Sequence, residues 1–439
     1  MSLRPPFTSW PLFDTFRKLF SGSFWLILAG VLGQGSMLVS NFLVANIVGV
    51  HGYGRYSLLQ TTIQMLAGLA QISLTVVIAQ QVARAREHDS KLAGEIATFG
   101  FLVVFSVALL CSLGLFFGRG IIAEHLFRDP SIAFGLGIAA LAIPWVAGAA
   151  VQQGLFTGLE RFREQAWIAV VLVPVVVAVP AFGALRGGFV GAVVGVTLAY
   201  FLRFVFPQLV VMRLFRQAGL AWTLGNVRTK ASVIFQYALP ATVSGLFNSL
   251  AIWGGQTLLV RSGGGPTTVG LFAAAYMIKT MAMFVPSQMA IALLPMLSRF
   301  YANPITGNPR RLLLGSASLC ALFTAGIAGT GILAAGPIMG LFGRDFTSGS
   351  LVLAILLAAT PLEAITLNFT LRFQASSQFW RALVSTNLPL AMTVLGVGAV
   401  LVPRWQATGL ACAWLLGWTV ALGGTLVGSG LRKRFSGGS

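Results

Sequence analysis

The chain has 439 residues, of which 56% are hydrophobic and only 9% are charged, and its mean hydropathy is +0.86. This composition excludes an ordinary soluble domain and indicates a protein that crosses a membrane many times. The formal net charge of +19 would suggest nucleic-acid binding in a soluble protein, but here the basic residues lie between apolar runs. No nucleic-acid partner is therefore expected.

The apolar runs, at about 20 residues per crossing, predict an all-α fold with twelve transmembrane helices. Residues 1–22 contain no signal-peptide cleavage site and are interpreted as a cytoplasmic lead-in. Six spans form a bundle over 23–212 and six more form a second bundle over 232–430, with a cytoplasmic linker at 213–231 and a basic cytoplasmic tail at 431–439. The predicted spans are 23–48, 56–83, 92–118, 132–158, 165–185, 188–212, 232–258, 268–296, 312–335, 349–373, 382–402 and 406–429.

The positive charges predict an orientation for these spans. Of the 29 Lys and Arg residues, 20 fall on the side that carries both termini and two, Arg203 and Lys279, fall inside spans. Because cytoplasmic loops carry the excess of Lys and Arg, both termini are expected in the cytoplasm. The remaining seven lie on the opposite side: Arg55, Arg119, Arg128, Arg186, Arg261, Arg344 and Arg404.

The second half of the chain resembles the first at a nearly constant offset. LFRDPSIAFGLGIAALAIP, which ends at Pro144, is matched by LFGRDFTSGSLVLAILLAATP, which ends at Pro361. Gly54 in YGRY is matched by Gly270 in VGLF, and the offsets stay between 215 and 218. The pattern predicts two pseudo-symmetric six-helix bundles in the same orientation, with a cavity between them.

Five motifs distributed along the chain carry a family resemblance. They are GVHGYGRYSLL after the first span, LFRDPSI before the fourth, GLFTGLERFREQA after it, TTVGLFAAAY at the eighth, and LFGRDFTSGSLVLAIL before the tenth. In this order and spacing, from about residue 20 to residue 430, the chain resembles the polysaccharide-flippase branch of the multidrug/oligosaccharidyl-lipid/polysaccharide exporter superfamily, whose best-known members are the Wzx-type O-antigen flippases.

The resemblance implies that the chain moves an undecaprenyl-pyrophosphate-linked oligosaccharide across the bacterial inner membrane by alternating access, for the synthesis of lipopolysaccharide or exopolysaccharide. It implies no cofactor, a monomer among membrane lipids, and polysaccharide polymerase machinery as a candidate partner. Many relatives carry an acidic residue late in the seventh span, where this chain reads SLAIWGGQTLLV, with Gln256. Any coupling role of that acid is therefore not transferred.

Four charged side chains fall inside predicted spans. Lys279 lies deep in the eighth span and is predicted to face the cavity, where its charge would compensate the phosphate of the cargo. Arg203 and Glu95 lie nearer to span ends, where a snorkelling or structural role is favoured. Glu363 follows Pro361, and three roles stay open for it: a pair with Lys279, a pair with Arg203, or uptake of a proton.

Uncharged polar side chains also recur in the spans, and Gln60, Gln64 and Gln71 share one helical face. They either line a cavity that faces sugars or hydrogen-bond between helices. Gln34, Gln152, Gln153 and Gln236 belong to the same polar group. The candidate cavity set is Lys279, Arg203, Glu363, Gln60, Gln64, Asn41, Asn248, Gln256 and Arg55.

Other functions fit the sequence less well. A MATE-type drug/cation antiporter is the first alternative, but it usually needs an acidic cavity, and a lipid II-type flippase resembles a protein of fourteen spans. An enzyme would need room for acid/base chemistry, and the longest predicted external loop is the short GRGIIAEHLFRDP. The cysteine and histidine spacings predict no metal site, and no Walker-type loop is present. The sequence leaves the driving force open among a proton, sodium, the membrane potential and downstream polymerisation.

Overall fold

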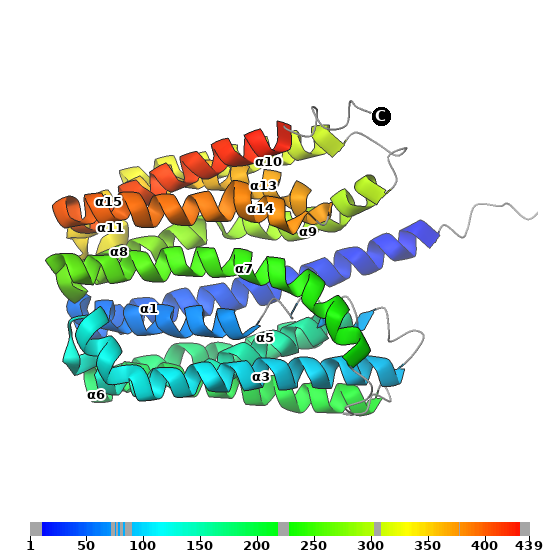
Figure 1. Cartoon of the computed structure of the whole chain (residues 1–439), viewed down its shortest axis with the longest axis horizontal. Coiled ribbons are helices and arrows are strands. Elements are labelled where there is room, and N and C mark those ends of the chain that lie inside the picture. Colours follow the sequence, from blue (N-terminus) through cyan, green and yellow to red (C-terminus); the bar gives the residue numbers. More distant parts are fainter. Residues whose placement is uncertain are drawn as a thin grey trace, which may run out of the picture.

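The computed structural model describes residues 11–71, 90–217, 228–302, 309–376 and 378–430, together with positions 75, 78, 79, 82 and 83. The predicted tail, the side chain of Gln236 and the middle of the predicted linker lie outside the described residues. Within them, all regular secondary structure is helical, and the helices run side by side in one bundle (Figure 1). The helices are α1 (Pro11–Gln71), α3 (Ser90–Ile121), α4 (Ala133–Ala140), α5 (Ile143–Gly158), α6 (Phe162–Gln217), α7 (Arg228–Leu259), α8 (Gly265–Ala282), α9 (Phe284–Ala302), α10 (Pro309–Leu333), α11 (Ala335–Gly340), α12 (Ser350–Ala358), α13 (Thr360–Ala375), α14 (Phe379–Ala382) and α15 (Leu388–Gly430).

Three of these helices each consist of two helices joined at a sharp break. The breaks lie at Gly49 in α1, at Gly187 and Gly188 in α6, and at Gln406 in α15. As a straight rod, the 56 residues of α6 would extend about 84 Å, far more than the ~30 Å hydrocarbon core of a bilayer. Each of the three long helices therefore fits a pair of membrane spans better than a single one.

The two arms of α6 pack against each other with their backbones in contact. A Cβ atom added at Gly183 would lie 2.2 Å from the carbonyl oxygen of Gly191, and one added at Gly191 would lie 2.0 Å from that of Gly183. Only glycine permits this approach, as is usual where membrane helices pack closely. The glycines thus fold α6 into a hairpin.

Seven continuous helical stretches of the described residues are long and apolar enough to cross a membrane. An eighth is present if the pair that bends by 46° between α8 and α9 is taken as one span. Since three of the seven contain the breaks described above, this arrangement agrees with a multi-span protein, while the count of twelve and the cytoplasmic position of the termini stay predictions.

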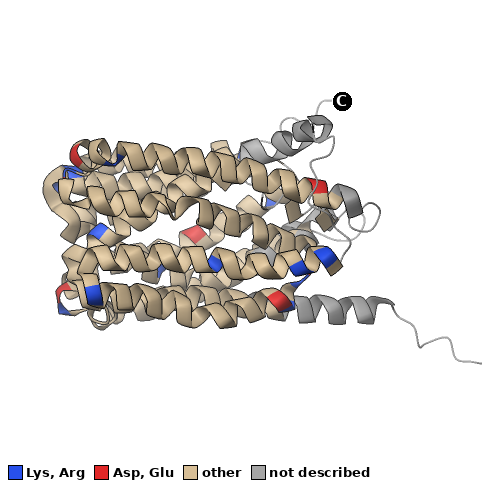
Figure 2. Ribbon diagram, turned by 90° about the horizontal axis from the view of Figure 1, so that it is seen from below, with Lys and Arg blue, Asp and Glu red and all other residues tan. Residues whose placement is uncertain are grey.

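The bundle has two ends that differ in structure. At the turn end, on the left of Figure 1, short connections join consecutive helices, and at the opposite, terminal end α1 begins and α15 finishes. Charged residues lie mainly at these two ends, and few lie along the middle of the bundle (Figure 2). This distribution is the one expected of a protein whose middle lies in hydrocarbon.

Proline interrupts one span in each half of the chain at matching places. Helix α4 gives way to α5 with Pro144 in its first turn, and α12 gives way to α13 with Pro361 in its first turn. A proline lacks the backbone N–H that would continue the preceding helix. The second of these breaks places Glu363 in the first turn of α13, where the helix dipole favours a negative charge.

The two halves of the chain meet most closely at two glycines near the turn end. A Cβ atom added at Gly54 of α1 would lie 1.7 Å from the carbonyl oxygen of Pro266, and one added at Gly270 of α8 would lie 2.2 Å from that of Val50. These are the two glycines that the sequence repeat aligns. Their contact joins α1 to α8, backbone against backbone, with no room for a side chain.

Candidate functional site

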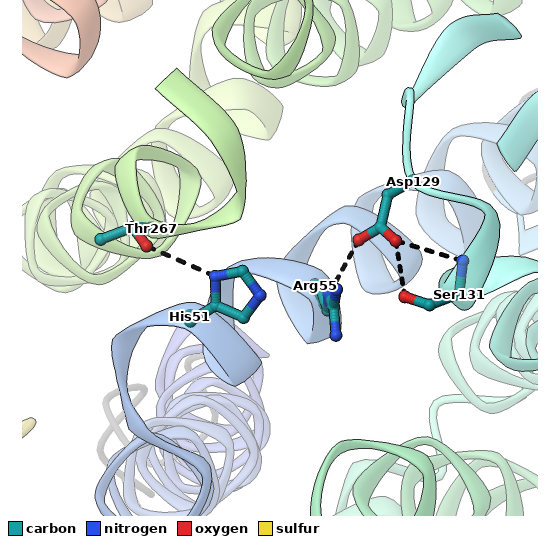
Figure 3. A network of polar contacts seen from close by, with 5 residues as sticks. All are labelled: His51, Arg55, Asp129, Ser131 and Thr267. Atoms are coloured by element: carbon teal, nitrogen blue, oxygen red, sulfur yellow. Dashed lines mark hydrogen bonds and ion pairs between the residues drawn. The ribbon is translucent and has the colours of Figure 1, made fainter. Parts of the chain in front are cut away.

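Hydrogen bonds join the two halves around this glycine contact. Figure 3 shows His51 of α1 facing Thr267 of α8, with 3.4 Å between the ring Nδ1 and the hydroxyl oxygen. Asn46 donates to the carbonyl oxygen of Leu341 at 2.7 Å, and Arg128 donates to that of Arg261 at 3.1 Å. The turn end is thus closed by contacts that cross from one half to the other.

Arg55, one of the predicted cavity residues, also lies at the turn end. Its Nε donates to Asp129 Oδ2 at 2.8 Å, and Oδ1 of the same carboxylate accepts from the hydroxyl of Ser131 at 2.5 Å (Figure 3). Asp129, the partner of Arg55, and Ser131 both belong to the connection between α3 and α4. In this conformation Arg55 therefore orders a turn within the N-terminal half.

Gln256 of α7 connects the halves nearer the middle of the bundle. Its Oε1 accepts from the Thr61 hydroxyl at 2.9 Å and its Nε2 donates to the Ser57 hydroxyl at 3.4 Å. One turn earlier on α7, Trp253 Nε1 donates to Thr62 at 3.0 Å. The amide of Gln256 is thus buried and forms hydrogen bonds between helices of the two halves.

Three other polar residues of the predicted cavity set lie elsewhere in the structure. Asn41 is buried and accepts from the Tyr53 hydroxyl at 3.2 Å, and Gln60 donates to the Tyr56 hydroxyl at 2.9 Å. Asn248 lies exposed on α7. None of the three lines the cavity described next.

A cavity of about 520 Å³ lies among α1, α5 and α6, with one residue, Gln288, contributed by α9. Gln71 ends α1, Phe156 nearly ends α5 and Gln165 lies in the first turn of α6, so the cavity lies toward the terminal end. Its volume is typical of a small-molecule site. Seven of its lining side chains are glutamines: Gln34, Gln64, Gln71, Gln152, Gln153, Gln165 and Gln288.

Arg203 is the single charged side chain among the residues that line this cavity, and no Asp or Glu is among them. It lies exposed on the second arm of α6, and no ion pair joins it to a described residue. Nearby, Gln64 donates to the Tyr200 hydroxyl at 3.2 Å. The cavity therefore combines apolar walls with many amide groups and one positive charge.

Gln152, in the cavity wall, forms hydrogen bonds with only one end of its side-chain amide. It is only 1% exposed, and its Nε2 donates to the carbonyl oxygen of Phe204 at 2.9 Å and to Gln208 Oε1 at 2.8 Å. Its Oε1 is buried without a partner, and so is the Oε1 of Gln165. A buried acceptor left without a donor costs about 1–3 kcal/mol.

Lys279 and Glu363 form a buried ion pair in the C-terminal half. Nζ of Lys279 contacts Oε2 of Glu363, and the two side chains are 3% and 15% exposed. Lys279 lies in the last turn of α8 and Glu363 in the first turn of α13, so each sits at the helix end whose dipole stabilises its charge. Of the three roles open for Glu363, the structure has the pair with Lys279.

Aromatic rings enclose the ammonium of Lys279 further. Its Nζ lies 5.0 Å from the ring centre of Tyr276, 5.7 Å from that of Trp414 and 5.6 Å from that of Trp418. The faces of such rings attract a cation within about 6 Å. Lys279 thus faces neither lipid nor the cavity of Arg203, and its predicted contact with the cargo stays a prediction.

The sequence therefore identified part of the cavity. Of the candidate set, Gln64 and Arg203 line it, and Gln34, Gln71, Gln152 and Gln153 from the wider polar group line it too. The sequence analysis missed Gln165 and Gln288, although a glutamine inside an apolar span was the signal that identified the others. It also missed Tyr200 and Trp145, which no local pattern distinguishes from packing residues.

Comparison with known proteins decides the family. The sequence matches the model of the polysaccharide biosynthesis protein family over residues 19–301, more than half of the chain. The chain belongs to this family. The predicted resemblance to polysaccharide flippases is thereby confirmed.

Two relatives of this chain come from bacteria. The EPS I polysaccharide export inner membrane protein EpsE of Ralstonia solanacearum is 23% identical over 364 residues, which is 80% of each chain. Stage V sporulation protein B of Bacillus subtilis (strain 168) is 25% identical over 154 residues, 35% of this chain. That match spans only 29% of the Bacillus protein.

Solved structures show the same fold. One is the inward-facing conformation of a multidrug resistance MATE family transporter of the MOP superfamily, with a TM-score of 0.78, 17% identity and coverage of 93% of this chain and 94% of that one. Another is the lipid II flippase MurJ in an inward closed conformation, with a TM-score of 0.71, 12% identity and coverage of 93% and 87%. At these identities the likeness concerns the fold alone.

The buried pair gives a prediction about stability. Lys279→Met should lower the free energy of unfolding by about 3–5 kcal/mol, because it leaves the Glu363 carboxylate buried without its partner. Adding Glu363→Gln should recover most of the loss. The measurement is thermal unfolding of the detergent-solubilised protein. The exposed pair of Arg161 and Glu164, 3.1 Å apart, is the matched control, and Arg161→Met should cost less than about 1 kcal/mol. An unchanged melting temperature in Lys279→Met would contradict a closed pair.

Proposed function

We propose that this protein is a flippase that moves an undecaprenyl-pyrophosphate-linked oligosaccharide from the cytoplasmic to the periplasmic leaflet of the bacterial inner membrane. The lipid tail of such a cargo stays in the bilayer, so only its polar head needs a route across ~30 Å of hydrocarbon. The observation that carries the proposal is a cavity whose single charged lining residue is Arg203. A guanidinium binds phosphate oxygens with two parallel hydrogen bonds.

The position of the cavity supports loading from the cytoplasm. The excess of positive charge assigns the terminal end to the cytoplasmic side, and the cavity lies toward that end. The turn end is closed by the contact of Gly54 with Pro266 and by the hydrogen bonds around it. Alternating access then requires the two halves to separate at the turn end and to close at the terminal end.

The direction of transport follows from the charge of the cargo. The inside-negative potential favours outward passage of negative charge by about 2.3 kcal/mol per charge per 100 mV. A proton, sodium or downstream polymerisation could add to this driving force. Among the described residues, Lys279 and Glu363 form the one buried ion pair. We propose that the protein works as a monomer that hands its product to polymerase machinery.

The charge of the cavity also separates the alternatives. A MATE-type antiporter of cationic drugs would need a carboxylate where its cargo rests, whereas the one charged residue lining this cavity is a cation. A lipid II-type flippase would also carry a pyrophosphate head. Arg203 serves both lipid-linked cargoes, so the glycan is what distinguishes them.

Arg203→Gln should reduce export at least tenfold, because the substitution keeps a polar side chain but removes the charge that compensates the phosphate. The measurement is surface polysaccharide in a strain whose own copy of the gene is deleted, normalised to the amount of protein in the membrane. Arg186→Gln is the matched control, since Arg186 is exposed at the turn end and should tolerate the change. Normal export by the Arg203 variant would remove the main support for this function.

Alternating access can be tested by cross-linking the two halves at the turn end, so that this end cannot open. Cysteines replacing His51 and Thr267, in a background with Cys111, Cys320 and Cys412 changed to Ala, should form a bridge with a short thiol cross-linker because the native side chains touch. Cross-linking should stop export, and a reductant should restore it if the linker is cleavable. Each single cysteine is a control that should keep exporting after the same treatment. Export by the fully cross-linked protein would show that the turn end need not open.

A further inference from the structure

Two broken spans of the C-terminal half are joined to each other at their breaks. The pair of α8 and α9 bends by 46° at Met283, and α12 gives way to α13 at Ala359. Lys279 lies one turn before the first break, and Glu363 lies one turn after the second. Their buried ion pair therefore ties the two breaks together.

A proline accounts for each break. Pro286 has no N–H to donate to the carbonyl oxygen of Ala282. Pro361 likewise leaves the carbonyl oxygen of Leu357 without its helical partner, and the hydroxyl of Thr360 donates to that oxygen at 2.7 Å instead. Because the missing bonds are fixed by the sequence, these two places are where the spans can change their bend at least cost.

The side chains beyond the two breaks pack apart from the main core. Met283, Cys320 and Ala364 form a small buried cluster at the level of the breaks. A second cluster, formed by α9, α10 and α13, consists of Ala290, Leu293, Leu297, Leu313 and Leu371. Among the described residues, the main core reaches Ala282 on α8 and Leu357 on α12 and contains none of these side chains. The apolar packing thus changes from one unit to another at the breaks.

The terminal lobe, defined as α9, α13 and residues 309–320 of α10, also borders the cavity of Arg203. Gln288 of α9 is the one lining residue that comes from the C-terminal half. A Cβ atom added at Gly30 of α1 would lie 3.5 Å from its Nε2, an ordinary contact distance. A Cβ atom added at Gly33, which also lines the cavity, would meet no atom within 4 Å. The lobe therefore touches α1 at one level and has open space beside that contact.

Other connections of the lobe to its own half resist movement less than the ion pair does. Helix α10 continues from the lobe into the main core, but a Cβ atom added at Gly326 or Gly329 of that later part would meet no atom within 4 Å. The hydroxyl oxygen of Thr370 in α13 lies 3.4 Å from that of Thr386, longer than the usual ~2.8 Å. Separating the ion pair, in contrast, would leave buried charges without a partner.

We propose that the terminal lobe turns as one unit about the pair of Lys279 and Glu363, which is the pivot of the gate that closes the cavity at the terminal end. The pair stays closed while the bends on either side of it change. Lys279 and Glu363 are thus positioning residues, which act through α9 and its Gln288. The inference rests on the alternating access of the proposed function, but it does not depend on the charge of the cargo.

The test measures distances between spin labels on the full-length protein in lipid nanodiscs. Cysteines for the labels replace Thr157 and Gln374, two exposed residues in the last turns of α5 and α13 that do not line the cavity. Cys111 and Cys412 are changed to Ala, and Cys320 is kept because it is fully buried.

The decisive variant carries Lys279→Met and Glu363→Gln together, which removes both charges without leaving either unpaired. Gln374 lies about 20 Å from the start of α13, so a turn of the lobe by about 10° moves it by about 4 Å. The distribution of distances from Thr157 to Gln374 should widen by at least this amount. Export should fall about tenfold or more, as expected for a hinge variant, although the protein melts close to the wild-type temperature. The distance between labels at Leu319 and Gln374, both in the lobe, should stay unchanged.

Pro286→Ala tests the same pivot without touching the pair. The alanine N–H restores a donor for the Ala282 carbonyl oxygen, which should reduce the bend and shift the distance from α5 to α13 by about 4 Å. This variant decides the question if the neutral pair does not fold. Arg161→Met with Glu164→Gln neutralises an exposed pair and is the matched control, for which wild-type distances and export are expected.

The outcomes distinguish the pivot from the function on which it rests. Unchanged distances in the neutral pair and in Pro286→Ala would overturn the pivot, and so would a changed distance within the lobe. Widened distances with normal export would show that the lobe moves without gating the cavity, which also overturns it. In each of these cases the flippase proposal stands, because its own test is Arg203→Gln. Normal export by Arg203→Gln with widened distances in the neutral pair would support the pivot and remove the anionic cargo.

Discussion

A charge within a membrane must be paired or must reach water, and this constraint governs how the chain uses its few intramembrane charges. Lys279 is paired: its ammonium contacts Glu363, is enclosed by aromatic rings, and is almost completely buried. Arg203 instead lies exposed in a cavity, with no carboxylate among the lining residues. A neutral pair in one half and an available cation in the other give the interior a net attraction for an anion.

The uncharged polar side chains are divided in the same way into groups that are paired and groups that are available. Between the turn end and the middle of the bundle, amides and hydroxyls such as those of Gln256 and Thr61 bond to each other across the two halves. Toward the terminal end, the glutamines line open space, and two of their oxygens lack a donor. Because the backbones of Gly54 and Pro266 are already in contact, the turn end has no room for cargo in this conformation. Polar groups therefore hold one end shut and leave the other able to bind.

The helical bundle could be predicted from the sequence, but the pairing of the charged side chains could not. Apolar runs predicted a multi-span helical bundle, since such a pattern acts locally along the chain. The sequence repeat aligned Pro144 with Pro361, and the structure has a helix break at each of them. The break at Gln406 lies at the predicted boundary between the spans 382–402 and 406–429, but nothing in the sequence indicates that a non-glycine residue there has a φ of 48°. Tertiary packing decides which charged side chains pair, and the sequence does not show this packing. The sequence therefore favoured Lys279 over Arg203 as the cavity cation, whereas in the structure Lys279 pairs with Glu363 and Arg203 lines the cavity.

The most direct test of the account is an experimental map of the protein with farnesyl-pyrophosphoryl-N-acetylglucosamine bound. We expect density for the phosphates beside Arg203, with the pair of Lys279 and Glu363 intact. Phosphate density beside Lys279 with Glu363 displaced, or a ligand bound only outside the cavity of Arg203, would contradict it.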